Sequence, residues 1–216
     1  MAIVLIAIVV SGFSVVAFSR PGGVMETPLF LHMHGAVFLA WFVLLAVQAS
    51  LIGRGSVALH KRLGQISIAL AIAIVVIGYF VVSHAIGQPD KTIAGRPAVI
   101  GSIFPIFDII NFTAAYSLGI ANRANGIAHK RFMLSSAILM IDPAMARLVL
   151  GLGGHGVLIL VTEVALFAAM LCYDFYKLRR PHWATLIALG LYIIAFTVKL
   201  NIESITWWPG FLTAVF

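Results

Sequence analysis

Seven histidines are the residues of this 216-residue chain whose chemistry is most easily defined. Neutral imidazoles from two facing helices can ligate the iron of a b-type haem. The candidate ligands form two layers along the chain, one with His34, His84 and His155 (His32 as an alternate) and one with His60 and His129. These positions permit a bis-histidine haem b, although no spacing among them would be required by haem alone. No zinc or other metal site is predicted, because residues two apart on a helix, such as His32 and His34, point about 200° away from each other.

Ionisable and amide side chains within apolar segments form a second group. Charged groups inside a bilayer normally face the interior of a bundle or a wet cavity. We therefore expect a buried polar network in the predicted outer half, composed of Asp108, Asn111, Asp142, Arg147, Glu163, Lys199 and Glu203. The expected ion pairs join Lys199 to Glu163 or Glu203, and Arg147 to Asp142 or Asp108. Such pairs could form a functional cavity or serve only to lock the helices together.

Basic residues gather at the starts of apolar segments and form a third group. Its members are Lys61, Arg62, Lys130, Arg131, Arg179 and Arg180, together with His182. Positive charge at this position predicts contact with anionic lipid headgroups. The alternative is a site for one anionic group, such as a haem propionate or a phosphate. The sequence contains no hydrolase, kinase or dinucleotide motif, so no catalytic residue is predicted.

The segments that must position these groups are long and apolar. Hydrophobic residues make up 62% of the chain and charged residues 10%, whereas soluble domains have about 45–50% and about 25%. A membrane-spanning helix needs about 20 mostly apolar residues. Seven segments meet this length, at about 2–19, 28–52, 63–86, 97–120, 132–150, 156–176 and 183–205. The sequence therefore predicts an all-α polytopic membrane bundle, with residues 1–216 forming one domain.

The distribution of basic residues predicts the orientation of the bundle. The second, fourth and sixth loops hold nine lysines and arginines, while the odd loops hold only Arg20, Lys91 and Arg96. The positive-inside rule then places the N-terminus in the cytoplasm and the C-terminus outside. The net charge of +7 is explained by these loop clusters, so no nucleic-acid partner is predicted.

Several stretches together resemble a widespread group of uncharacterised bacterial multi-pass membrane proteins. They are LHMHGAVFLAWFVLLAVQASLIGRG at 31–55, LHKRLG at 59–64, AHKRFM at 128–133, DPAMARL at 142–148 and YDFYKLRRPHWATL at 173–186. The resemblance implies a bacterial inner membrane location and no particular activity. A looser similarity links the histidines at helix ends to transmembrane b-type cytochromes and haem-handling assembly factors.

Two functional expectations follow. The first is a component without a catalytic motif, surrounded by lipid: either an accessory subunit in contact with other membrane subunits, or a small transporter or sensor with an outer-facing polar cavity. The alternative is a redox protein that binds haem b through paired histidines.

Overall fold

The computed structural model describes residues 1–19 and 27–216 and is a bundle of α-helices. Arg20, which was counted among the basic residues of the odd loops, lies outside the described residues. The helices are α1 (Ala2–Ser19), α2 (Leu29–Gly53), α3 (Val57–Ile86), α4 (Ala98–Gly101), α5 (Ile103–Ala121), α6 (Gly126–Ile138), α7 (Asp142–Gly151), α8 (Val157–Leu178), α9 (Trp183–Leu200) and α10 (Trp208–Val215). Helices dominate because every backbone polar group must be satisfied within its own segment when lipid surrounds the chain.

Six stretches of the described chain are long and apolar enough to cross a membrane. They are Leu29–Gly53, Val57–Ile86, Ala98–Ala121, Gly126–Gly151, Val157–Leu178 and Trp183–Leu200. This confirms an integral membrane protein with an all-α bundle. The helix α1 is also apolar, but its described apolar stretch, Ala2–Phe18, is shorter. The count of seven spans therefore stays a prediction.

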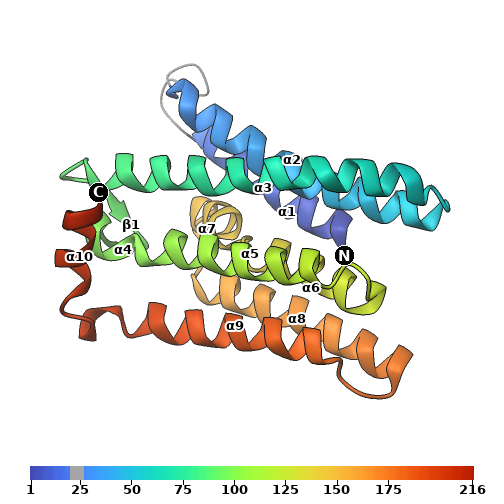
Figure 1. The fold of residues 1–216 in the computed structure, drawn as a ribbon. Coiled ribbons are helices and arrows are strands. Elements are labelled where there is room, and N and C mark those ends of the chain that lie inside the picture. The colour runs from blue at the N-terminus through green and yellow to red at the C-terminus, as the bar shows by residue number, and fades with distance from the viewer. Residues whose placement is uncertain (20–26) are drawn as a thin grey trace.

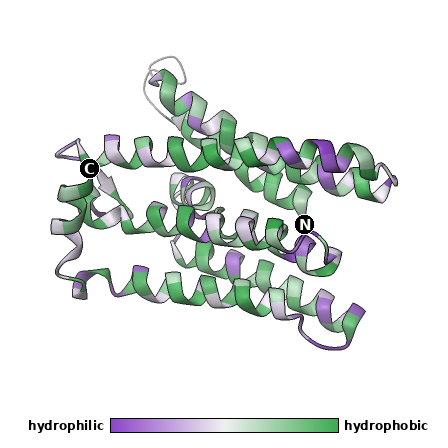
Figure 2. Cartoon of the chain, in the orientation of Figure 1, coloured by the Kyte–Doolittle hydropathy of each residue, from purple (hydrophilic) through white to green (hydrophobic). Residues whose placement is uncertain are grey.

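The long helices lie roughly lengthwise beside one another, as Figure 1 shows. The connections α2–α3, α5–α6 and α8–α9 lie at one end, at the right of the view, which we call the basic end. Figure 2 shows hydrophobic residues along the full length of these helices. Large apolar side chains such as Phe80 and Ile194 remain exposed, as expected for surfaces that face lipid.

Two of the predicted continuous segments are broken helices. Segment 97–120 is α4 followed by α5, and segment 132–150 is α6 followed by α7. The second break covers residues 139–141, where the amides of Met140 and Ile141 bond to carbonyls three residues back and tighten the last turn of α6. Pro143, within the first turn of α7, has no amide hydrogen to contribute to a continuous ladder. In Figure 1, α7 is seen almost end-on and runs across the bundle.

The end of the bundle opposite the basic end is covered by short elements. The predicted segment 183–205 ends early, because α9 stops at Leu200 and a 3₁₀ turn, η1 (Ile202–Ser204), follows. A two-stranded hairpin, β1 (Thr92–Ile93) and β2 (Arg96–Pro97), precedes α4. Buried Ile103, Ile202, Trp208 and Leu212 join η1 and α10 to the start of α5 in one small apolar cluster.

Candidate functional site

Lys199 on α9 lies at the centre of a buried polar cluster. Its Nζ atom donates hydrogen bonds to Asp108 Oδ1 at 2.5 Å and to Asp142 Oδ2 at 2.6 Å. Asp108 lies on α5, and Asp142 is the first residue of α7. One amine therefore ties three helices together. The predicted pairing of Lys199 with Glu163 or Glu203 is wrong.

A third carboxyl group and two neutral side chains complete this cluster. Glu163 on α8 is buried, and its Oε2 accepts a hydrogen bond from the Tyr192 hydroxyl at 3.0 Å. Asn111 lies one turn after Asp108 and donates to the Leu191 carbonyl at 3.5 Å. We call Asp108, Asp142, Glu163 and Lys199 the acid–lysine site. These four residues, with Asn111 and Tyr192, line a cavity of about 10 Å³, which is space for about one water molecule.

The charges of the acid–lysine site do not balance. With all of its groups ionised, three carboxylates and one ammonium would give a formal charge of −2. Uncompensated charge is strongly unfavourable in a membrane interior and is normally neutralised by a proton, a counter-ion or water. The arrangement can therefore hold protons on its carboxyl groups or accept a small cation.

The break between α6 and α7 positions one acid of the site. Asp142 begins α7, where the positive end of the helix dipole favours negative charge. The intervening residues Leu139, Met140 and Ile141 are buried in protein. Interrupted helices at membrane depth are tolerated where they are buried in protein or line a cavity, and in transporters such interruptions form ion and substrate sites.

Two residues predicted for this network lie outside it. The side chain of Glu203 is 75% exposed and pairs with Arg96 at 3.2 Å. The helical spacing from Lys199 to Glu203 is lost because α9 ends at Leu200. Arg147 Nη1 donates to the Pro143 carbonyl at 2.8 Å, and its guanidinium lies 5.1 Å from the centre of the Phe13 ring. Among the described residues, the ion pairs of Asp108 and Asp142 are with Lys199, and neither predicted pair with Arg147 is found there.

Phe104 separates the exposed ion pair from the buried site. The Arg96 guanidinium carbon lies 6.0 Å from the centre of the Phe104 ring, and Lys199 Nζ lies 5.7 Å from the same centre. Both distances are within the range in which a ring attracts a cation. One aromatic side chain therefore contacts the surface pair and the acid–lysine site together.

At the basic end, a buried ion pair clamps three helices. Arg131 on α6 donates from Nε to Asp174 Oδ1 at 2.7 Å, and its Nη2 bonds to the same oxygen. Asp174 Oδ2 accepts hydrogen bonds from the His182 amide at 3.0 Å and the Thr185 hydroxyl at 2.6 Å. Arg131 is only 4% exposed. Its predicted contact with lipid headgroups is therefore wrong, because its donors are directed into the bundle.

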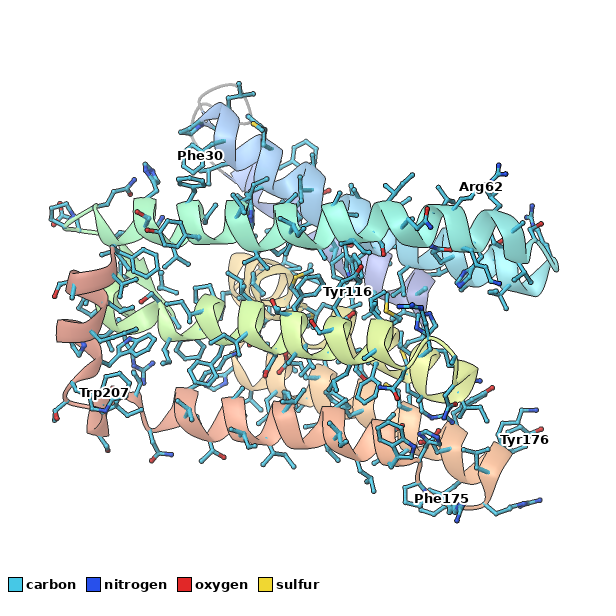
Figure 3. The ribbon with its side chains drawn as sticks, viewed as in Figure 1. Phe30, Arg62, Tyr116, Phe175, Tyr176 and Trp207 are labelled. Atoms are coloured by element: carbon cyan, nitrogen blue, oxygen red, sulfur yellow. The ribbon has the colours of Figure 1, made fainter. Side chains whose placement is uncertain are left out.

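The other predicted headgroup residues remain on the surface of the basic end. Lys61, Arg62, Lys130, Arg179 and Arg180 are exposed, and Figure 3 shows Arg62 near the end from which Tyr176 also projects. Their contact with lipid stays a prediction.

His182 has a different role from that of its basic neighbours. Its Nδ1 accepts a hydrogen bond from the Ala184 amide at 3.2 Å and so caps the start of α9. Burial, followed by the positive charge of Arg131, lowers the pKa of His182 below its ordinary value. The structure therefore favours the neutral form, which can accept this hydrogen bond.

Of the five candidate haem ligands, His60 and His129 lie next to each other, and the other three have other neighbours. The His34 ring lies 4.2 Å from that of Phe38, measured between centres. His84 contacts Gln88 and the Phe30 ring, and exposed His155 accepts a hydrogen bond from the Val157 amide. By contrast, the rings of His60 and His129 lie beside each other with their centres 6.2 Å apart. Among the described residues, no three His, Cys, Asp or Glu side chains are grouped as metal ligands.

Sequence reasoning missed Tyr192 and Thr185 as members of these polar clusters, and it did not pair Asp174 with Arg131. Tyr192 precedes Lys199 by two helical turns, and this spacing places the hydroxyl and the amine on one face of α9. That spacing could have identified Tyr192. Nothing comparable links Asp174 to Arg131, which belong to different helices.

Comparison with known proteins gives no match. No protein-family model matches the chain, and no curated protein or solved structure matches it either. The resemblance to bacterial multi-pass membrane proteins stays a prediction.

Proposed function

We propose that this protein is a small proton-linked transporter or sensor of the bacterial inner membrane, and that the acid–lysine site is its proton-binding centre. One observation carries the proposal. Three carboxyl groups and a single amine surround a water-sized cavity where the helix of the fifth predicted span is interrupted.

Charge imbalance supports proton binding at this site. The site has two more carboxyl groups than amines. Its excess negative charge is neutralised when one or two of the carboxylates take up a proton. Protonation would also change the contacts between helices, because Asp108 and Asp142 share the Lys199 amine. A proton on either carboxyl weakens one of these two bonds. The proton content of the site is thereby linked to the contacts among α5, α7 and α9.

The location of the site supports access from outside. The acid–lysine site lies toward the end opposite the basic loops, because Lys199 is in the last turn of α9. The positive-inside rule assigns that end to the outer face. The site then corresponds to the outer-facing polar cavity expected from the sequence.

Infrared difference spectroscopy of the purified protein tests proton binding directly. Between about pH 8 and about pH 5, the wild type should gain a carbonyl band of protonated carboxylic acid. The variants Asp108→Asn and Glu163→Gln, at the two most buried carboxyl groups of the site, should each lose part of this band. Glu203→Gln is the matched control, because Glu203 is an exposed carboxylate outside the site. If Asp108→Asn and Glu163→Gln titrate like the wild type, the site does not bind protons and the proposal fails.

Reconstitution distinguishes a transporter from a sensor. Liposomes that contain the protein and a trapped pH-sensitive dye would report proton movement after an external pH step. Flux that Asp142→Asn abolishes indicates transport. Protonation of the site without flux indicates a sensor.

An accessory-subunit role is favoured by a separate observation. An apolar groove of about 320 Å³ lies between α1 and α2 and is lined by residues that include Val9, Phe13, Leu31, Gly35 and Leu39. A helix of another membrane subunit could pack into such a groove. Native mass determination of the gently extracted protein tests this role. A free monomer would contradict it.

A further inference from the structure

The two His-Lys-Arg segments of the sequence meet in space at the basic end. His60 lies in the first turn of α3 and His129 in the first turn of α6. Their rings are 6.2 Å apart between centres, with an angle of 89° between the ring planes. The similarity of LHKRLG and AHKRFM thus corresponds to two imidazoles from two helices that lie beside each other in an edge-to-face arrangement.

Hydrogen bonding fixes the tautomer of one imidazole. His129 Nδ1 lies 2.8 Å from the Gly119 carbonyl oxygen. Because a carbonyl oxygen only accepts, Nδ1 carries the hydrogen, and the lone pair of the neutral ring lies on Nε2. A bond from Nδ1 to a backbone carbonyl is also what orients metal-binding histidines in proteins.

Two buried polar atoms, one on α3 and one on α2, lack partners within the described part of the chain. His60 Nδ1 and Gln48 Oε1 are buried and make no hydrogen bond there. Gln48 on α2 lies against α3, since its Nε2 is 3.6 Å from the place that a Cβ on Gly64 would occupy. Gly64 follows His60 by one helical turn. Buried polar atoms without partners are rare in folded proteins, and a bound ion is one explanation for them.

The separation of the two rings fits a shared metal atom. Zinc and similar ions bind imidazole nitrogen at about 2.0–2.1 Å, so the ring centres of two ligands lie roughly 5 Å apart in a tetrahedral site and roughly 6.5 Å apart on opposite sides of the metal. The observed 6.2 Å falls in this range, near the opposed arrangement.

We propose that His60 and His129 are the two protein ligands of a transition-metal centre at the basic end. Imidazole suits zinc, copper and iron. A free ion and a haem iron share this chemistry, and the experiment distinguishes them. Lys61 and Lys130, each next to one of the histidines and exposed, could contact anionic groups that accompany the metal.

Two measurements on the purified full-length protein test the proposal. An optical spectrum before and after dithionite reduction detects haem through its Soret band. Titration of metal-free protein with Co²⁺, followed by its visible absorption and by competition with Zn²⁺, detects a free-ion site. Either signal supports the centre if His60→Ala and His129→Ala each reduce it at least about tenfold.

Control variants separate a metal centre from a structural histidine pair. His155→Ala, at an exposed histidine, should leave binding unchanged, and so should Glu163→Gln, which alters only the acid–lysine site. If His60→Ala does not fold, His60→Gln and His129→Asn serve in its place, with circular dichroism to confirm helicity. The proposal would be overturned if the protein bound neither haem nor Co²⁺, or if binding persisted when both His60 and His129 were replaced. Neither outcome bears on proton binding by the acid–lysine site.

Discussion

At the scale of single residues, the membership of the acid–lysine site could be predicted from sequence but its pairings could not. Ionisable side chains inside apolar segments identified Asp108, Asp142, Glu163 and Lys199 as members of one polar network. The pairings depend on the depth and direction of each helix. Depths counted along straight helices fail for Asp142, because α7 runs across the bundle, and for Glu203, because α9 ends before it.

Replacing Lys199 should be strongly destabilising. In Lys199→Met, Asp108 and Asp142 lose their common cation, and breaking a buried ion pair from one side costs about 3–5 kcal/mol. Thermal unfolding in detergent should show a large fall in midpoint. Glu203→Gln removes an exposed pair worth at most about 1 kcal/mol and should unfold almost like the wild type. Equal midpoints for the two variants would show that Lys199 is not the main support of the site.

His182 should make stability depend on pH at the basic end. Its pKa is lower in the folded protein than the ordinary 6.5, so the unfolded chain takes up a proton first as the pH falls. The contribution of neutral His182 to the free energy of unfolding is complete above about pH 6.5. This contribution is lost as the pH falls toward the pKa of the folded protein. The charged groups around the ring are Arg131, Asp174, Arg180 and Lys130.

The matched variant for this pH dependence is His182→Asn. Asparagine can cap α9 without titrating, so the fall in unfolding midpoint below about pH 6.5 should be smaller than in the wild type. Identical pH profiles would assign the acid sensitivity to other groups.

At the scale of elements, the sequence predicted the positions of the long helices but not their interruptions. Predicted and observed boundaries agree within a few residues for α2, α8 and the start of α9. The break at 139–141 was missed because Leu139, Met140 and Ile141 continue the apolar run without a polar signal. The Asp142–Pro143 pair was the available sign, since proline is favoured in the first turn of a helix.

The contact between α1 and α7 should depend on one glycine. A Cβ at Gly12 would collide with the backbone carbonyl oxygen of Ala144, which cannot rotate away as a side chain can. Gly12→Ala should therefore force the helices apart and destabilise the protein by about 1–3 kcal/mol. Gly190→Ala on α9 is the control, since nothing lies within 4 Å of its new Cβ. It should be neutral or stabilising by up to about 1 kcal/mol. Similar unfolding midpoints for the two variants would contradict this account of the α1–α7 contact.

At the scale of the whole molecule, composition alone was sufficient to predict an integral membrane protein. A chain with so many apolar residues on its surface requires a bilayer, and the six long apolar stretches fit one. Orientation depends on loop charge and stays a prediction, as does the membrane crossing of α1. The N-terminus lies on the side of the basic end and the C-terminus at the other end (Figure 1).

Cysteine labelling should establish the orientation. Cys172 is the only cysteine, so Cys172→Ser provides a background without thiols. Ser56→Cys lies in the α2–α3 connection at the basic end, and Ser204→Cys lies in η1. A membrane-impermeant thiol reagent added to intact cells should label the variant at position 204 and not the one at 56. The reverse pattern would invert the topology and place the acid–lysine site toward the cytoplasm.

The exposed Arg96–Glu203 pair makes the end opposite the basic end more sensitive to salt than the interior of the bundle. The pair is open to solvent, and the distance over which dissolved ions screen charge shrinks from about 8 Å at 0.15 M salt to about 3 Å at 1 M. Added salt therefore weakens the ion pair between β2 and η1. The ion pair of Lys199 with Asp108 is buried and is screened much less. Phe104 contacts both cations. The ion pair that joins the hairpin to η1 above the buried site should therefore be weaker in a more saline medium.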